Sequence, residues 1–405
     1  MRIYTQPDIE NVVRISSEHV DKWEDSSWPA LRAELIAVLK ENGYRIRNGT
    51  GDERIKLIGS DGVQNHVKRS AAYVFFGIPT IGELLKVTSL FVGLQTLDPD
   101  LHYFEDEVKY RKPVIIYGNK VGYSHLIKAL NRLHKEGTIG QEVEKLIHFA
   151  ETPAQLMEKL NLKVKAQDSI HGHGKKLDDE DGQVLDIGTH KAGKYPELPD
   201  FRVCGYTSAS RVQDEKSITE AYKLGKYIGD NKFALVSGLG YIGLMNELHK
   251  GAVENGGCSI GSNCPHILSQ EKLPPGWEEA YIVPDIYSRM DVMFMPSDFI
   301  VIAAGGRGGG GTMQEYLAAL LLMSLGKLAM QVRDKKFREF SPYKPIVIDN
   351  RKGIWDDLIA LSESHGFYEN QHFKVVSGTD EVIQAIEDYR AGKLGLCPDE
   401  ENCGF

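Results

Sequence analysis

Apolar and polar positions along the chain fall into blocks that differ in period. Continuous apolar runs of strand length are followed by longer segments whose apolar residues recur at helical spacing. The runs that predict buried strands are residues 71–76, 113–117, 233–237 and 299–304. Strands that alternate with helices in this way form parallel sheets covered by helices on both faces. The pattern therefore predicts an α/β protein with parallel sheets flanked by helices.

Further elements are expected between these runs. Additional strands are predicted at residues 44–47, 201–208, 280–283 and 346–348, and helices at 28–40, 84–92, 217–228, 285–295 and 313–325. Residues 98–112 form a polar segment between two predicted elements. After Tyr117, helical segments are expected up to about residue 160.

The length of 405 residues exceeds one ordinary domain, so two are expected. Between residues 161 and 200 the sequence becomes charged, carries glycine and proline, and loses periodicity, which is typical of a linker. We therefore predict two tandem Rossmann-like domains, one over residues 1–160 and one over 201–390. A polar tail follows over 391–405.

The two predicted domains share an ordered set of short matches. In each, a glutamate stands three residues after a threonine and 29 residues before a Lys-Pro pair that opens an apolar strand. The matching residues are Thr80, Glu83, Lys112 and Pro113 in the first half and Thr312, Glu315, Lys344 and Pro345 in the second. Ordered matches of this kind indicate an internal repeat. Because the first copy lacks most of the glycines, we interpret it as a structural copy whose site has decayed.

Charge and hydropathy narrow the classes of partner. A formal net charge of −9 argues against binding of nucleic-acid polymers, which require a basic face. The N-terminus lacks an apolar core of signal-peptide length, and no apolar run has the length of a membrane span, so no membrane partner is expected and the predicted compartment is the cytoplasm. The five cysteines include no CxxC pair and are expected to be reduced thiols.

No metal site is predicted. His171 and His173 form a His-x-His pair, but no further ligands stand at usable spacing. Solvated loop histidines are therefore the better interpretation.

The most distinctive stretch runs from Asp298 to Glu315, where six of the seven residues from 305 to 311 are glycine. An apolar strand run precedes these glycines, and a segment rich in Ala, Leu and Met follows them. Strand, glycine loop and helix together present backbone N–H groups and the positive end of a helix dipole to a phosphate. The alternative is a flexible surface loop, which seldom lies between a buried strand and a buried helix. The stretch therefore predicts a phosphate site.

A second glycine-spaced turn, Gly238 to Met245, follows another predicted strand. A dinucleotide-binding fingerprint would need an acidic partner at the end of a second strand, and none is clear here. No nicotinamide or flavin cofactor is expected.

Four segments of the second half carry a family pattern. They are Cys204-Gly-Tyr-Thr-Ser208, Gly238-Leu-Gly-Tyr-Ile-Gly-Leu-Met-Asn246, Ile286-Tyr-Ser-Arg-Met290 and Ala304 to Glu315. Together they resemble the Lonely Guy (LOG) family of nucleoside 5′-monophosphate phosphoribohydrolases, often mislabelled lysine decarboxylases. The corresponding family motifs are Cys-Gly-Ser-Ser, Gly-Gly-Gly-x-x-Gly-Leu-Met-Gly, Met-His-x-Arg-Lys and Pro-Gly-Gly-x-Gly-Thr-x-x-Glu. The resemblance covers residues 201–390 well and 28–160 weakly.

The departures from the family pattern include two residues of the arginine motif and the length of the glycine loop. Met290 stands in place of the lysine and Tyr287 in place of the histidine. The glycine loop is three residues longer, so either Gly305-Gly306 or Gly308-Gly309 takes the place of the first two family glycines.

The resemblance implies an N-glycosidase that hydrolyses nucleoside 5′-monophosphates, such as AMP, to free base and ribose 5-phosphate without a cofactor. It also implies that Arg289 and Glu315 are catalytic. The residues expected to bind substrate or its phosphate are Gly205, Ser208, Gly238, Gly240, Gly243, Met245, Gly305, Gly306, Gly308, Gly309, Gly310, Gly311 and Thr312. Because family members generally dimerise, the two halves are expected to pack as an intramolecular pseudo-dimer, and a further homo-oligomer remains open.

The chemistry of the residues agrees with these roles. Hydrolysis of an N-glycosidic bond passes through an oxocarbenium-like ribosyl cation, which a nearby carboxylate stabilises. Glu315 is predicted to stabilise this cation and orient water, while Arg289 holds the phosphate or polarises the base. Ser208 and Thr312 would add hydroxyl contacts to the phosphate. The structural alternatives are a helix-capping glutamate and a solvated arginine.

Three functions follow from these observations. The first is a nucleotide N-glycosidase. The second is a sensor or carrier that binds a nucleotide or a related phosphate cofactor without turnover, which the long loop and Met290 favour. The third, an interaction scaffold, gives the polyglycine loop no purpose and ranks last.

Overall fold

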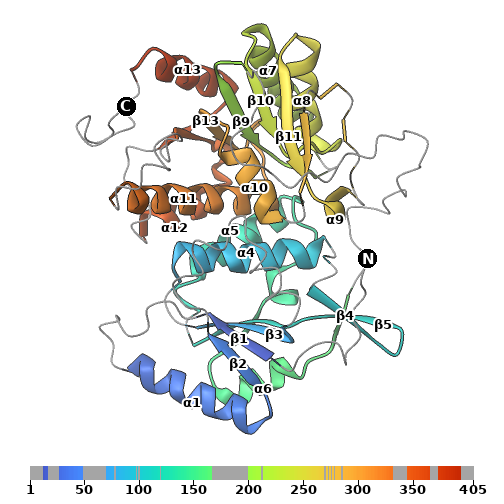
Figure 1. The fold of residues 1–405 in the computed structure, drawn as a ribbon, viewed down its shortest axis with the longest axis vertical. Coiled ribbons are helices and arrows are strands. Elements are labelled where there is room, and N and C mark those ends of the chain that lie inside the picture. The colour runs from blue at the N-terminus through green and yellow to red at the C-terminus, as the bar shows by residue number, and fades with distance from the viewer. Residues whose placement is uncertain are drawn as a thin grey trace. The chain divides into compact units, whose positions relative to one another are not determined.

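Two parallel β-sheets, each flanked by helices, organise the chain (Figure 1). The computed structural model describes residues 12–16, 27–48, 70–76, 79–96, 98, 101–118, 120–166, 199–210, 213–268, 271, 273–274, 276–277, 279–283, 286–331, 344–364 and 373–393. The chain divides into one unit of residues 1–134 with 140–170 and another of residues 135–139 with 171–405. The predicted α/β class with parallel sheets is confirmed. The domain boundaries stay a prediction, and most of the expected linker and tail lies outside the described residues.

The first unit contains a five-stranded parallel sheet in the order β2-β1-β3-β6-β7. Its strands are β1 (Val12–Ser16), β2 (Arg45–Asn48), β3 (Ala72–Phe76), β6 (Val114–Tyr117) and β7 (His148–Ala150). Helices α1 (Ser27–Glu41) and α6 (Pro153–Leu160) cover one face, and α4 (Ile81–Gln95) and α5 (Ser124–Lys135) cover the other (Figure 1). Leu35, Leu39 and Leu156 pack against the buried apolar side chains of β3 and β6.

A small antiparallel sheet has two strands in the polar segment of residues 98–112 and a third at the start of the predicted linker. It consists of β4 (His102–Glu105), β5 (Val108–Arg111) and β8 (Val164–Lys165), in the order β4-β5-β8. Asp106 and Glu107 turn between β4 and β5 with φ values of 47° and 65°. Two residues at positive φ are typical of a type I′ hairpin, for which Asn-Gly or Asp-Gly is the usual signal. The Asp-Glu pair gives no such signal.

The helical segments expected between Tyr117 and residue 160 are present, but a strand between them was not predicted. The chain forms α5, the 3₁₀ turn η4 (Val143–Lys145), strand β7 and then α6. Strand β7 is only three residues long, which is too short for a periodic signal.

The second unit contains a seven-stranded parallel sheet in the order β12-β11-β10-β9-β13-β14-β15. Its strands are β9 (Arg202–Tyr206), β10 (Ala234–Ser237), β11 (Cys258–Asn263), β12 (Glu279–Ile282), β13 (Phe299–Ile302), β14 (Ile346–Asp349) and β15 (Phe373–Val376). The helices are α7 (Glu215–Asp230), α8 (Gly243–Glu254), α9 (Pro265–Leu268), α10 (Ile286–Phe294), α11 (Gly310–Gln331), α12 (Asp356–Ser364) and α13 (Thr379–Arg390), with a 3₁₀ turn η7 (Arg351–Gly353). Figure 1 shows α7, α8 and α13 on one face of the sheet and α10, α11 and α12 on the other. A buried cluster including Leu224, Leu248 and Ile386 joins the first group of helices to β9, β13 and β14.

The strand order reverses beside β9. Strands β10, β11 and β12 follow on one side of it, while β13, β14 and β15 lie on the other. In open α/β sheets ligands bind beyond the carboxyl ends of the strands at such a reversal. The loops after β9 and β13 are the Ser208 turn and the glycine loop, so the fold brings together the two segments that the sequence predicted to hold phosphate.

The order β2-β1-β3-β6-β7 of the first sheet recurs in the second as β10-β9-β13-β14-β15. The connecting helices correspond as well, with α1, α4 and α6 in the positions of α7, α11 and α13. This correspondence of strands and helices is expected if the two units are copies of one another. That residues 1–160 are a decayed copy, and that the halves pack as a pseudo-dimer, stay predictions.

The described cysteines Cys204, Cys258 and Cys264 are free thiols. Burial raises the pKa of Cys204 to about 12, so this thiol stays protonated in the core. Within the described part of the chain, no helix combines the length and the apolar character that a membrane crossing requires.

Candidate active site

Arg289 of α10 and Glu315 of α11 form a buried ion pair at the carboxyl end of the second sheet. The distance from Arg289 Nη1 to Glu315 Oε1 is 3.3 Å, and each residue is 7% exposed. The sequence predicted these two residues as the catalytic pair from segments 26 positions apart. The fold brings them into direct contact.

Two backbone carbonyls fix the orientation of Arg289. Its Nε donates to Ser262 O at 3.0 Å, and its Nη2 donates to Gly238 O at 3.3 Å. These carbonyls lie at the ends of the neighbouring strands β11 and β10. Because arginine presents its N–H groups in a rigid fork, the two bonds hold the guanidinium against Glu315. Strand β11, which supplies one of the carbonyls, was not predicted from the sequence.

The pKa of Glu315 is raised from its ordinary value of 4.5 to about 7. Burial is the main cause, since it disfavours the ionised carboxylate. The positive charge of Arg289 lowers this pKa, and the negative charge of Glu271 raises it again. A carboxyl group with such a pKa changes its protonation state near neutral pH, which suits acid–base chemistry.

The glycine turn after β10 lies directly beside this pair. A Cβ on Gly238 would fall 1.8 Å from Arg289 Nη2, and one on Gly240 would fall 2.3 Å from Glu271 Oε2. Met245 lies against both glycines, and its sulfur accepts from the N–H of Gly240 at 3.1 Å. Only glycine leaves room for these close approaches.

The same turn also approaches the loop after β9. Gly243 has a φ of 55°, and a Cβ there would fall within 2.7 Å of the carbonyl oxygens of Ser208 and Ser210. Gly205, which was also predicted to bind substrate, lies inside β9, where a Cβ would meet Leu248 of α8 at 2.4 Å. The structure thus places Gly205 at a close packing contact between helix and strand.

The glycine loop turns sharply before α11 begins. Ala303, Gly305 and Gly306 have φ values of 58°, 83° and 80°. Helix α11 starts at Gly310, three residues earlier than predicted, so Gly310 and Gly311 belong to its first turn. Thr312 lies in the same turn, and Glu315 follows on the next one. A phosphate at this helix start would meet backbone N–H groups and the positive end of the dipole.

The predicted hydroxyl ligands are engaged within the protein. Thr312 Oγ1 donates to Thr207 O at 3.0 Å and accepts from the Gly309 N–H at 3.2 Å. Ser208 Oγ accepts from the Ser210 N–H at 3.1 Å and from Gln213 Nε2 at 3.0 Å. Both hydroxyls therefore shape the loops around the crevice.

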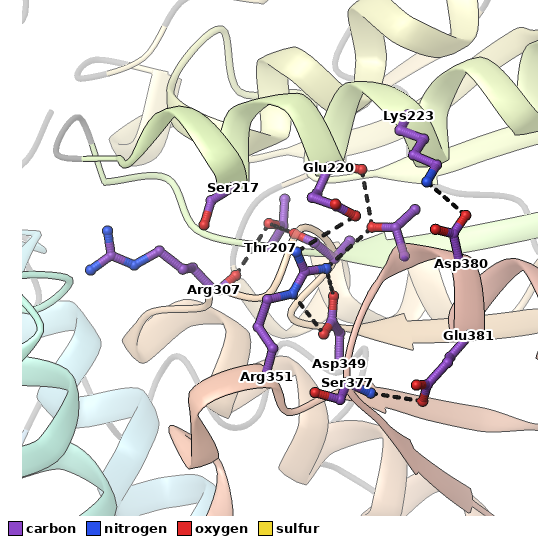
Figure 2. Close-up of polar contacts among 12 residues, drawn as sticks. Thr207, Ser217, Glu220, Lys223, Arg307, Asp349, Arg351, Ser377, Asp380 and Glu381 are labelled. Carbon is purple, nitrogen blue, oxygen red and sulfur yellow. Dashed lines mark hydrogen bonds and ion pairs between the residues drawn. The ribbon is translucent and has the colours of Figure 1, made fainter.

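A buried ion cluster that the sequence did not reveal supports the glycine loop from below (Figure 2). Arg351 of η7 pairs with Asp349, its Nε lying 3.0 Å from Oδ1, and a second bond runs from Nη2 to Oδ2. Its Nη1 lies 3.6 Å from Glu220 Oε2, and its Nη2 donates to Thr379 Oγ1 at 3.2 Å. A Cβ on Gly306 would fall 2.2 Å from Arg351 Nε, so the loop backbone rests directly on this side chain.

Two more residues have informative positions. Glu271, which follows α9, brings a second carboxylate to the site beside Gly240. No sequence motif marked it, since its nearest neighbours in the chain are polar and aperiodic. Met290, at the place of the family's lysine, is 1% exposed and belongs to the core.

Within the described residues no group of three metal-binding side chains comes together. His171 and His173 lie outside these residues, so the prediction about them is not addressed.

Residues 245–389 match the sequence model of a family described as possible lysine decarboxylase. No curated protein sequence matches the chain significantly.

The solved Moco carrier protein from Chlamydomonas reinhardtii is 19% identical, with a TM-score of 0.34, over 47% of this chain and 98% of that one. A molybdenum cofactor binding protein from Rippkaea orientalis is 18% identical, with a TM-score of 0.34, over 47% and 97%. UDP-GlcNAc 2-epimerase from Neisseria meningitidis is 12% identical, with a TM-score of 0.34, over 97% and 95%. The family match includes α10, the glycine loop and α11, and hence both Arg289 and Glu315.

Proposed function

Because residues 245–389 form a lysine decarboxylase-like domain of the LOG family, we propose that this protein hydrolyses the N-glycosidic bond of nucleoside 5′-monophosphates. The products are a free base and ribose 5-phosphate. The observation that carries the proposal is the buried Arg289–Glu315 pair, with a carboxyl group of pKa about 7 beside a glycine loop and helix start suited to phosphate.

In this proposal the phosphate binds at the first turn of α11, against Gly308 to Thr312. Glu315 lies one turn further along the same helix and so faces the ribose of a phosphate-anchored substrate. Its ionised carboxylate stabilises the ribosyl cation as the bond to the base breaks. The same group then accepts a proton from the attacking water, because its pKa is close to the working pH. That proton passes to the departing base, so the base leaves neutral and the carboxylate of Glu315 is regenerated.

Arg289 acts mainly on Glu315. Two of its N–H groups are bound to the carbonyls of Ser262 and Gly238, and a third faces the carboxylate. Its positive charge favours the ionised form of Glu315, which burial alone would disfavour even more. The guanidinium has five N–H groups, so two remain for the ribose hydroxyls, the phosphate or the leaving base.

The activity can be tested by incubating the pure protein with AMP, GMP, CMP and UMP. Free base and ribose 5-phosphate should appear in equal amounts from at least one of them, and heat-denatured protein should release neither. Binding of every nucleotide without release of base would contradict the proposal.

A second candidate is non-catalytic binding of a nucleotide or another phosphate cofactor. The burial of Met290 favours it, because the site then lacks the cation that the family pattern places next to the arginine. The same incubation distinguishes the two functions, since a carrier or sensor would bind the ligand and return it unchanged.

A further inference from the structure

Glu271 is a second carboxylate of the candidate active site that the proposed chemistry does not use. Its Oε2 lies over Gly240 in the turn after β10, so closely that a Cβ on that glycine would be 2.3 Å away. Its backbone N–H donates to Ile267 O in α9 at 2.9 Å, which anchors its position in the chain. The charge of Glu271 acts on Glu315 and raises its pKa, so the two carboxylates share one electrostatic environment.

The strand order indicates which part of a substrate reaches Glu271. The phosphate loop follows β13, and β9 separates β13 from β10. Arg289 is bound to the ends of β10 and β11, and Glu271 lies over the turn after β10. Two strand spacings of about 4.8 Å separate β13 from β10. A nucleotide whose phosphate lies at β13 and whose ribose lies at Glu315 therefore extends across β9, with its base toward β10 and Glu271.

We propose that Glu271 recognises the base of the nucleotide by accepting a hydrogen bond from its exocyclic amino group. This inference rests on the proposed function, because it takes the substrate to be a nucleoside monophosphate bound in the same site. The site then selects bases with an exocyclic amino group over those with a carbonyl oxygen at the same ring position. A carboxylate accepts from an amino group and repels a carbonyl oxygen.

Matched nucleotide pairs test this preference. AMP and IMP differ by an amino group against a carbonyl oxygen at one position of the purine, and CMP and UMP differ in the same way in the pyrimidine. In each pair the adjacent ring nitrogen also changes from an acceptor to an N–H donor, so the comparison tests recognition of the exocyclic amino group against that of the ring N–H. A hydrogen bond to a charged group corresponds to a factor of about 10 to 100 in affinity. We expect AMP and CMP to bind more tightly than IMP and UMP by a factor of this size.

Affinity should be measured by calorimetry in a Glu315→Gln background, so that turnover does not consume the nucleotide. In the double variant with Glu271→Gln, the preference should fall to within about threefold, because a side-chain amide can both donate and accept. Glu363→Gln, on the exposed surface of α12, is the matched control and should leave the preference unchanged. Glu271→Asp, which keeps the charge, should keep the direction of the preference and thus shows that any loss in Glu271→Gln is not a folding defect.

Three results would overturn the inference. Equal affinity for the two members of each pair, or a preference unchanged by Glu271→Gln, would exclude Glu271 as the base reader while leaving the proposed hydrolysis standing. Absence of binding to any nucleotide would remove both proposals. If base selection is found without hydrolysis by the native protein, the inference holds and the hydrolase proposal fails.

Discussion

Arg289 Nη1 and Glu315 Oε1 lie 3.3 Å apart in a pair that excludes almost all solvent. In the first half of the chain, the glutamate of the repeated Thr-x-x-Glu pattern has a different role. Thr80 and Glu83 form a capping box at the start of α4, in which the Thr80 N–H donates to Glu83 Oε2 at 3.0 Å and the Glu83 N–H donates to Thr80 Oγ1 at 3.3 Å. Glu83 thus caps its helix, which is the role that the sequence left open as the alternative for Glu315. Glu315 instead lies beyond the cap and pairs with Arg289.

Activity is expected to rise with pH through a single ionisation near 7. The ionised form of Glu315 stabilises the ribosyl cation, and its pKa is raised to about 7 by burial and by Glu271, against the opposing effect of Arg289. Cys204 and Tyr206 of β9 also interact electrostatically with Glu315. Burial raises the pKa of both groups and keeps them protonated. A profile of kcat/KM against pH should therefore have an ascending limb near 7, and Glu271→Gln should move that limb to lower pH. A limb near 4.5 in the native protein would show that the pKa of Glu315 is not raised.

Stability should depend on pH through the same residue, with the opposite sign. Between pH 4.5 and about 7 the folded protein binds more protons at Glu315 than the unfolded chain does, so the free energy of unfolding falls as pH rises through this range. Glu315→Gln removes this contribution. Relative to the native protein, the variant should gain on the order of 3 kcal/mol in unfolding free energy between pH 4.5 and pH 8. Thermal melts at the two pH values measure the difference, and parallel changes in both proteins would count against the raised pKa.

Gly238→Ala should disable the site while the fold survives. The new methyl group would fall 1.8 Å from Arg289 Nη2, and a side-chain end is easier to displace than backbone. We expect a loss of about 1–3 kcal/mol in stability, as for other overpacked sites, together with a large fall in kcat/KM. Circular dichroism and base-release assays on the same sample separate these effects. Unchanged activity would mean that the position of Arg289 has little importance.

Gly311→Ala tests the phosphate site without disturbing the free protein. A Cβ at this position meets no atom within 4 Å, and the residue lies in the first turn of α11. The substitution should leave stability unchanged or raise it by about 0.4–1 kcal/mol, because alanine restricts the unfolded chain. A phosphate bound at this helix start would meet the methyl group, so the dissociation constant for AMP should rise. An unaltered dissociation constant would place the phosphate elsewhere.

The Arg351–Asp349 pair should be essential to the glycine loop. Asp349 is fully buried, and Arg351→Met would leave its carboxylate without its main partner. Breaking a buried pair in this way costs about 3–5 kcal/mol. Arg351→Met combined with Asp349→Leu should recover part of this stability but not the affinity for AMP, since Gly306 would lose the side chain on which it rests. Additive losses in the double variant would show that the two side chains are not coupled.

The sequence predicted the elements with long and regular patterns. Helices α1 and α7 and strands β10 and β14 lie within about two residues of their expected bounds, since their apolar spacing is unambiguous. Strand β11 was missed because Cys258–Asn263 is half polar, with Ser259, Ser262 and Asn263 buried in the sheet. Burial of polar side chains by tertiary contacts cannot be foreseen from local pattern.

The residues of the candidate site also divide into those that a local pattern predicts and those that only the tertiary fold reveals. Arg289, Glu315 and the two glycine turns belong to motifs with local spacing, and the fold brings these residues together. Glu271 and Arg351 belong to no motif. Glu271 follows β11 and α9, and Arg351 follows β14, so they reach the site only because the strand order places β11 beside β10 and β14 beside β13. The sequence also assigned direct phosphate contacts to Ser208 and Thr312, which stay predictions; their hydroxyls hydrogen-bond within the loops around the site.

Release of adenine from AMP by the native protein, Glu315→Gln and Glu83→Gln tests the central claim most directly. Glu83 is the matched control, because it occupies the same place in the repeated pattern and glutamine also supports a capping box. We predict that Glu315→Gln lowers the rate of release by about 10²–10³-fold, as expected for the loss of a group aimed at transition-state charge, while AMP still binds. Glu83→Gln should release adenine at the native rate. Equal rates in Glu315→Gln and the native protein, or no release by the native protein at all, would contradict the account.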